Sequence, residues 1–346
     1  MTRVFEHADD RDHAIMTTED VLHHIKQSAD NTDLNGISDQ NIRAMQSVGM
    51  FSPQPYPELM EMARKVAYHC GASGMLAISF SQSRGAVQDM DVLEDNDLVA
   101  PALFHDKAFV RSEGGMFVID GTWPAVGGVQ HASLIFLQGL TLNDQPVSAL
   151  IRSEDATITQ KAYFGGLRGA GWAQVDVQGL KVEKTAIRPQ ASSDRLTGIA
   201  MLGALMGVAE AAYDDYVQST RKRVAGIGGA SVAQFTQVQS RVAESDVEMK
   251  AVRLLYGNLR ASIGSNALSD ESFVELIRDG AYIARQLVES IGRLHKQMGA
   301  MGLSEKNTVQ RRFRDMRALE SLADLDWNSA MAKFGRKELG ISEVAA

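Results

Sequence analysis

Two short glycine-rich stretches are places where this chain could hold a flat ligand. WPAVGGVQH occupies residues 123–131, and YFGGLRGAGW occupies residues 163–172. Glycine lets backbone N–H groups approach a planar ring that a Cβ would push away, and the indole of Trp123 or Trp172 could cover a ring face. The two stretches therefore fit a planar cofactor, although ordinary tight turns explain glycine equally well.

Hydrophobic patterning predicts a mainly α protein with a central β domain (α+β), which would hold these stretches between helical layers. In PELMEMARKVAYHC, Leu59, Met62 and Val66 recur at helical spacing, and similar patterns predict a helical domain over 1–103. From 104 to 188, short alternating runs separated by turn residues predict a β barrel or sandwich. Two hairpins are expected there, at a Glu-Gly-Gly turn and at an Asn-Asp turn.

Residues 189–346 return to helical patterning and predict a four-helix bundle. The stretch 196–217 is almost uncharged, which indicates a helix buried on most sides. Ser269 or Asp270 could cap the third bundle helix. Three further helices are expected at about 232–260, 271–298 and 308–339.

Composition limits the partners. The net charge is −8, and the basic residues are scattered, so no nucleic-acid surface is expected. The chain has one cysteine, Cys70, and no apolar run near the roughly 20 residues that cross a bilayer. The first residues, MTRVFEHADDRDH, are too charged for a signal peptide, so the cytoplasm is the expected compartment.

The order of domains resembles the acyl-CoA dehydrogenase superfamily, and the motifs are closest to its branch of two-component (group D) flavin monooxygenases. In that branch the first loop typically reads G-x-W-x-x-x-S-G-x-x-H-A, and this chain has Gly127 in place of the serine. The second typically reads G-L-R-G-T-G-S, and Trp172 replaces its serine. VQRRFRDMRA is similar to the L-x-R-x-x-R-D signature, with Arg311, Arg314 and Asp315 in place. The N-terminal domain looks shortened relative to the superfamily.

The resemblance implies a flavin lying against the two glycine-rich loops. FAD is the first candidate, and FMN is the alternative. Near the start of the bundle, Arg221, Arg223 and Gln239 would hold the diphosphate half across a subunit interface, because a guanidinium binds two oxygens at once. Solvated helix-end charges explain those residues equally well. The residues expected at the ring are Trp123, Val126, Gly127, Gly128, Arg168, Gly169 and Trp172.

The resemblance also bears on the chemistry. Many acyl-CoA dehydrogenases place a glutamate base a few residues beyond the Arg-Asp pair, where this chain has Ala323, although Glu320 or Asp324 could substitute. Of the polar residues that the monooxygenase branch typically carries beside the flavin, this chain has His131. An imidazole beside a reduced flavin could stabilise a flavin–oxygen adduct or deprotonate a phenol. Equally, His131 could cap a strand end.

We therefore expect a flavin-dependent enzyme. The first hypothesis is an oxygenase that uses reduced flavin and O2 on a small aromatic or CoA-thioester-linked substrate, in aromatic or secondary metabolism. The alternatives are an acyl-CoA dehydrogenase or oxidase and a flavin-free scaffold. The resemblance further implies a separate flavin reductase and a homodimer or homotetramer, and the spacing of histidines and cysteine predicts no metal site.

Overall fold

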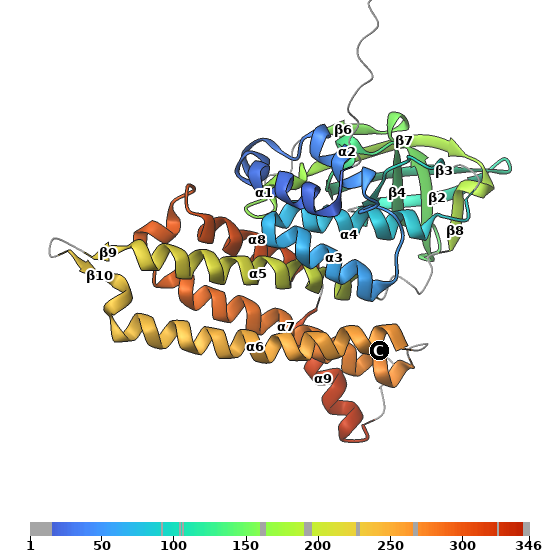
Figure 1. Cartoon of the computed structure of the whole chain (residues 1–346). Helices are drawn as coiled ribbons and strands as arrows, with labels where there is room; N and C mark the ends of the chain where they lie inside the picture. Colours follow the sequence, from blue (N-terminus) through green and yellow to red (C-terminus); the bar gives the residue numbers. More distant parts are fainter. Residues whose placement is uncertain are drawn as a thin grey trace, which may run out of the picture.

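The computed structural model arranges the chain in layers (Figure 1). A mixed β sheet lies at one end, α4 (Gly71–Ala86) runs along it, and long helices extend away on the other side. The mainly α architecture with a central β domain agrees with the fold class expected from the sequence. The residues described are 16–90, 93–103, 105, 107–159, 164–189, 196–225, 229–265, 269–323 and 325–341.

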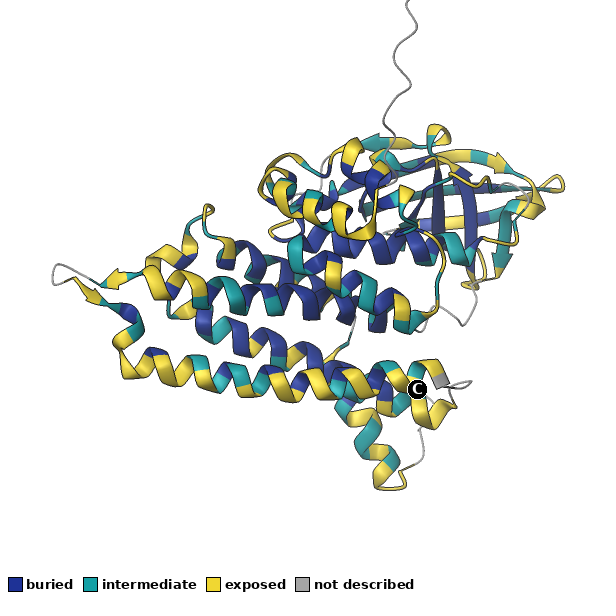
Figure 2. Cartoon of the chain, in the orientation of Figure 1, coloured by how far each residue is buried: buried dark blue, intermediate teal, exposed yellow. Residues whose placement is uncertain are grey.

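Helix caps in the N-terminal layer follow directly from the sequence. The Thr17 side chain accepts a hydrogen bond from the Asp20 amide, and the Ser38 side chain accepts one from the Asn41 amide. α4 is rich in glycine, alanine and serine and is buried at most positions (Figure 2). A Cβ at Gly74 would lie 2.5 Å from the Ala67 Cβ, so two helices of this layer approach closely. The other helices are α1 (Thr18–Asn35), α2 (Asp39–Ser47) and α3 (Tyr56–His69).

The described sheet has eight strands, in the order β6-β7-β3-β2-β4-β5-β8, with β1 pairing in parallel with β4. Both expected hairpins are present: β2 turns into β3 at Gly114 and Gly115, and β4 turns into β5 at Asp144, whose φ is 57°. The strands are β1 (Val99–Ala102), β2 (Lys107–Glu113), β3 (Met116–Val126), β4 (Leu134–Thr141), β5 (Pro146–Arg152), β6 (Thr157–Thr159), β7 (Ala173–Val182) and β8 (Ile187–Pro189). Because β1 precedes residue 104, the sheet begins inside the range where only helices were expected.

The bundle is built around α5 (Thr197–Lys222), which is buried along most of its length, as its uncharged sequence predicts (Figure 2). A Cβ at Gly203 would lie 2.9 Å from the Met60 carbonyl carbon, so glycine allows α5 to pack directly on α3. Ser269 caps α7, accepting from the Ser272 amide. α7 (Asp270–Lys296) and α8 (Thr308–Leu322) pack on α5, and α6 (Thr236–Ser265) and α9 (Trp327–Glu338) pack on α7.

One helix prediction was wrong. The single helix expected over 308–339 is two helices, α8 and α9, and the second begins at an Asp326 cap whose side chain accepts from the Ser329 and Asn328 amides. Cation–π contacts hold α9 against α7, with Arg278 4.0 Å from the Phe334 ring and Arg285 4.3 Å from the Trp327 ring. No helix in the described ranges has the length and apolar character that a membrane crossing requires.

Candidate functional site

The two glycine-rich loops meet at the junction of the sheet with the helices. The Gly128 amide donates a hydrogen bond of 2.7 Å to the Ala170 carbonyl, which joins the loop before η1 (Val129–His131) to η3 (Arg168–Ala170). The two stretches are therefore parts of one structure, although about 40 residues separate them in the sequence.

The first loop is fitted against α4. Gly128 has a φ of +70°, and a Cβ there would lie 2.7 Å from Phe80 Cζ and 2.8 Å from Leu76 Cδ2. Glycine is thus required both by the left-handed backbone and by the close approach of the helix. Helix packing by itself accounts for this glycine.

The second loop is fitted against α1 and α8. A Cβ at Gly169 would lie 2.6 Å from Thr32 Cγ2, and the Ile37 amide donates to the Gly169 carbonyl at 2.9 Å. Leu167 has a φ of +51°, which is costly for a residue with a branched side chain. Something outside the loop must hold Leu167 in that conformation.

Asp315 on α8 provides that anchor. Its carboxylate accepts a hydrogen bond of 2.7 Å from the Leu167 amide, and the side chain is fully buried. Burial raises the pKa of Asp315 to about 6, against the opposing effects of the Leu167 amide and the Arg311 and Arg312 guanidinium groups. The Arg-Asp signature therefore acts here by fixing a loop.

The neighbouring arginines of the signature tie α8 to α1. Arg314 donates to Asp33 at 2.8 Å and also to the Gly165 carbonyl, while Arg311 pairs with Asp30. Arg314 and Asp33 are both largely buried, at 13% and 11% side-chain exposure, so this pair is shielded from solvent. The loop is thereby held from two helices at once.

Trp123 does not cover a ligand face. Its side chain is 1% exposed, and Nε1 donates to the Gln138 carbonyl at 2.9 Å, which makes it a core residue of the sheet. Val126 is likewise fully buried. The sequence could not distinguish an indole pointing into the sheet from one pointing out, because β3 loses register with β7 between these two residues.

A partly exposed strip lies at that irregularity. Pro124 and Ala125 are half-buried, and the register Val126↔Ala173 places Trp172 beside them. Trp172 is half-buried, with its ring centroid 5.1 Å from that of Phe164. These residues form a partly exposed apolar strip beside buried Gly127.

His131 forms a pair with Asp39 at the start of α2. The distance from Nδ1 to Asp39 Oδ1 is 2.8 Å, and because a carboxylate can only accept, Nδ1 carries the hydrogen. Nε2 is buried and has no hydrogen-bond partner among the described residues. The side chain is 9% exposed, so the pair with Asp39 fixes the orientation of a largely buried imidazole.

The residues expected to bind a diphosphate lie at the far end of the bundle. Arg223 follows α5 next to the ribbon of β9 (Val224–Ala225) and β10 (Ala230–Ser231), which lies opposite the sheet in Figure 1. Arg221 is exposed, and Gln239 donates to the Ala233 carbonyl at 3.0 Å. Within one chain these residues do not meet the glycine-rich loops.

Two polar side chains at that end have a buried atom without a hydrogen-bond partner among the described residues. Arg223 Nη1 and Thr220 Oγ1 are buried without a partner in the part of the chain that the structure describes. Buried donors of this kind are costly unless a ligand or water satisfies them. At the loops, by contrast, Arg168 is already paired with Glu305 at 3.0 Å.

Of the two remaining candidate bases, Glu320 is the one that the structure describes. Ala323 is 1% exposed, and Glu320 is bonded to Arg317 at 2.8 Å. Asp324 lies outside the described residues. No group of three His, Cys, Asp or Glu side chains that could hold a metal occurs in the described ranges.

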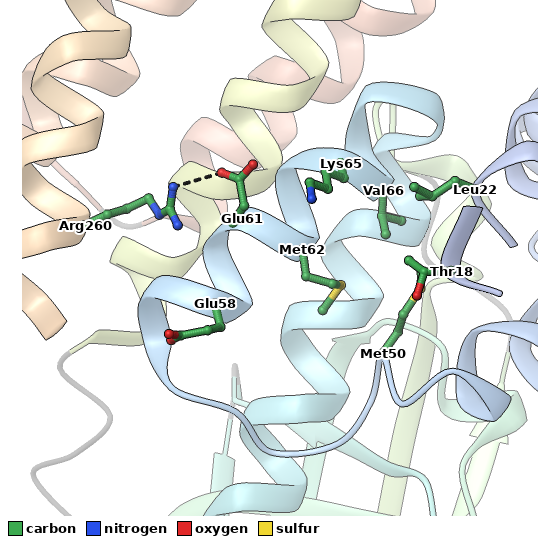
Figure 3. Close-up of a pocket in the computed structure, with 9 residues that line it drawn as sticks. All are labelled: Thr18, Leu22, Met50, Glu58, Glu61, Met62, Lys65, Val66 and Arg260. Carbon is green, nitrogen blue, oxygen red and sulfur yellow. Dashed lines mark hydrogen bonds and ion pairs between the residues drawn. The ribbon is translucent and has the colours of Figure 1, made fainter. Parts of the chain in front are cut away.

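A separate pocket of about 290 Å³ opens between α1, α3 and α6 (Figure 3). Met50, Met62 and Val66 give it an apolar floor, and its rim carries an ion pair of 2.9 Å between Arg260 and Glu61. It contains none of the residues that the sequence identifies as candidates.

Sequence reasoning missed Asp39 and Thr220 and gave Asp315 no role. A first-turn helix position such as 39 carries no signal for a contact with a histidine 92 residues away. Asp315 belongs to a motif that the sequence did contain, but only the structure shows its partner.

Part of the chain matches a known family, and most of it is similar to characterised proteins. Residues 199–327 match the family "Acyl-CoA dehydrogenase, C-terminal domain". The chain is 26% identical to the flavin-dependent monooxygenase, oxygenase subunit HsaA, of Mycobacterium tuberculosis over 96% of each chain. It is 24% identical to the FADH(2)-dependent resorcinol hydroxylase, oxygenase component, of a Rhizobium species over 83% of this chain and 81% of that one.

A solved structure shares the fold along the whole length. The 3-HSA hydroxylase from Rhodococcus superposes with a TM-score of 0.82 at 21% identity, covering 94% of this chain and 97% of the other. Residues 199–327 therefore match the acyl-CoA dehydrogenase C-terminal domain, and the chain is similar, over most of its length, to oxygenase components of flavin-dependent monooxygenases.

Proposed function

We propose that this protein is the oxygenase component of a flavin-dependent monooxygenase that hydroxylates a small aromatic substrate with reduced flavin and O2. The observation that carries the proposal is similarity along nearly the whole chain to proteins named as such components. Alanine at 323 argues against an acyl-CoA dehydrogenase, because no carboxylate base stands there. A reduced flavin would supply the two electrons that oxygen needs.

The chain's own residues would bind and orient the reactants. The strip of Pro124, Ala125 and Trp172 would receive the flavin ring, since these residues are the half-buried part of the junction between the two loops. His131 would accept a proton at Nε2, oriented by the Asp39 carboxylate at Nδ1. The surrounding helices α4 and α8 would exclude water from this junction.

We infer that two copies of the chain complete each cofactor site. Thr220 and Arg223 lie at the C-terminal end of α5, beside β9 and opposite the sheet in Figure 1, so a cofactor that reaches this end and the glycine-rich loops must bridge two subunits. A dinucleotide is long enough to do so, which favours FAD over FMN. The outer face of α6 offers a contact surface, since Val247 and Leu254 are 61% and 73% exposed and lie with Ala251 on one face.

A separate flavin reductase would be the natural electron donor, as the names of the relatives describe them as subunits or components. The experiment is single turnover: protein loaded with chemically reduced flavin without oxygen, then mixed with a phenol and ¹⁸O2. Incorporation of ¹⁸O into the ring supports the proposal. Flavin bleaching by a CoA thioester without oxygen would instead indicate a dehydrogenase, and failure to retain any flavin would indicate a scaffold.

A further inference from the structure

Gly127 and Trp172 contact each other across the two glycine-rich loops. The φ of Gly127 is not positive, unlike that of Gly128, so the backbone does not require glycine there. A Cβ at Gly127 would lie 3.2 Å from Trp172 Cζ3 and 3.2 Å from Met75 Cε. The indole and the methionine therefore demand a small residue at position 127.

The same two positions are where the chain departs from the monooxygenase pattern, which carries serine at both. Because the two residues touch, the glycine at 127 and the tryptophan at 172 depend on each other. Two hydroxyl groups are absent, and a single indole takes up the space. A side chain at 127 would press on the indole at 172, which would have to shift by a few tenths of an ångström to accommodate it.

The rings of Trp172 and Phe164 form an apolar aromatic surface, and a hydrogen bond fixes the orientation of the indole. Trp172 Nε1 donates to the Leu167 carbonyl at 3.0 Å, so the indole has no free polar atom. Its ring is tilted by 58° to that of Phe164, which is 46% exposed. The nearby guanidinium groups of Arg168 and Arg314 are engaged by Glu305 and Asp33.

We propose that the aromatic surface formed by Phe164 and Trp172 binds the ring of the substrate, and that Gly127 sets the position of this surface. The inference rests on the proposed function and adds the substrate class, a planar and uncharged ring. A carboxylate on the ring would lose hydration against this surface and gain no partner.

The steric part is tested without any ligand, by thermal unfolding of Gly127→Ser, Trp172→Ser and the double variant. Gly127→Ser alone should lower Tm by roughly 2–6 °C, because a side chain is forced against the indole. In the Trp172→Ser background the same change should cost clearly less, because the close neighbour that then remains is the flexible tip of Met75. Gly165→Ser is the matched control, since its Cβ would meet nothing within 4 Å. Additive effects of the two substitutions would overturn the coupling.

The binding part uses p-cresol and 4-hydroxybenzoate, which differ in a methyl against a carboxylate. Equilibrium dialysis with flavin-loaded protein should show p-cresol bound more tightly, and Phe164→Ala should weaken it about 3- to 10-fold at unchanged flavin content. Trp327→Phe, on α9, is the control. Equal affinity for the two phenols, no binding of either, or an unaffected Phe164→Ala variant would overturn the proposal. A wild-type protein that retains no flavin would instead refute the proposed function, while the steric coupling could still hold.

Discussion

The buried carboxyl group of Asp315 should make the free energy of unfolding depend measurably on pH. The folded-state pKa is about 6, against 3.8 for a free aspartate. A shift of about two pKa units corresponds to about 3 kcal/mol. Because the folded pKa is raised, the folded state binds the proton more tightly than the unfolded state does. Stability from this group is therefore fully present below pH 4 and is lost as the pH rises to about 6.

Asp315→Asn removes this dependence while keeping an oxygen that can accept the Leu167 hydrogen bond. The free energy of unfolding should be measured by urea denaturation of the wild type and the variant from pH 4.5 to 7.5. The wild type should lose about 2 kcal/mol relative to the variant across that range, most of it below pH 6.5. Glu305→Gln, which removes an exposed carboxylate facing the same loop, should give a curve parallel to the wild type.

Parallel curves for wild type and Asp315→Asn would refute this reasoning. They would mean that the Arg311 and Arg312 guanidinium groups keep the carboxylate ionised at no net cost. Asp315→Ala gives a second check, since it leaves the buried Leu167 amide without an acceptor. It should lower the unfolding free energy by about 2 kcal/mol at pH 7.

Three further outcomes are expected. Gly128→Ala should lower both Tm and flavin retention, because its Cβ would press on Phe80 and φ is positive at this residue. Gly165→Ala is the control and should change neither quantity. An unchanged Tm for Gly128→Ala would contradict the packing. His131→Gln should slow hydroxylation about 100-fold or more at unchanged flavin binding, measured by rapid-quench single turnover, and a normal rate would exclude His131 as the proton acceptor. Leu254→Glu should reduce the particle mass measured by light scattering, and a wild-type protein that is already monomeric would refute the contact at α6.

The sequence predicted the fold well because its signals are local. The uncharged stretch at 196–217 predicts a buried helix, and the turn residues predict both hairpins, each from a few neighbouring residues. The division into α8 and α9 was missed because the apolar pattern continues through the break. The strand β1 was missed because its partner, β4, lies more than 30 residues away.

At the candidate site, the sequence by itself determined which residue types were present: two glycine-rich loops, a histidine and an Arg-Asp motif. The tertiary structure decided what they contact. Trp123 is buried in the sheet. The Gly128 amide donates to the Ala170 carbonyl, the Leu167 amide donates to Asp315, and His131 pairs with Asp39. The last three contacts join segments 42 to 148 residues apart in the chain, so they follow from tertiary packing and leave no periodic signal in the sequence.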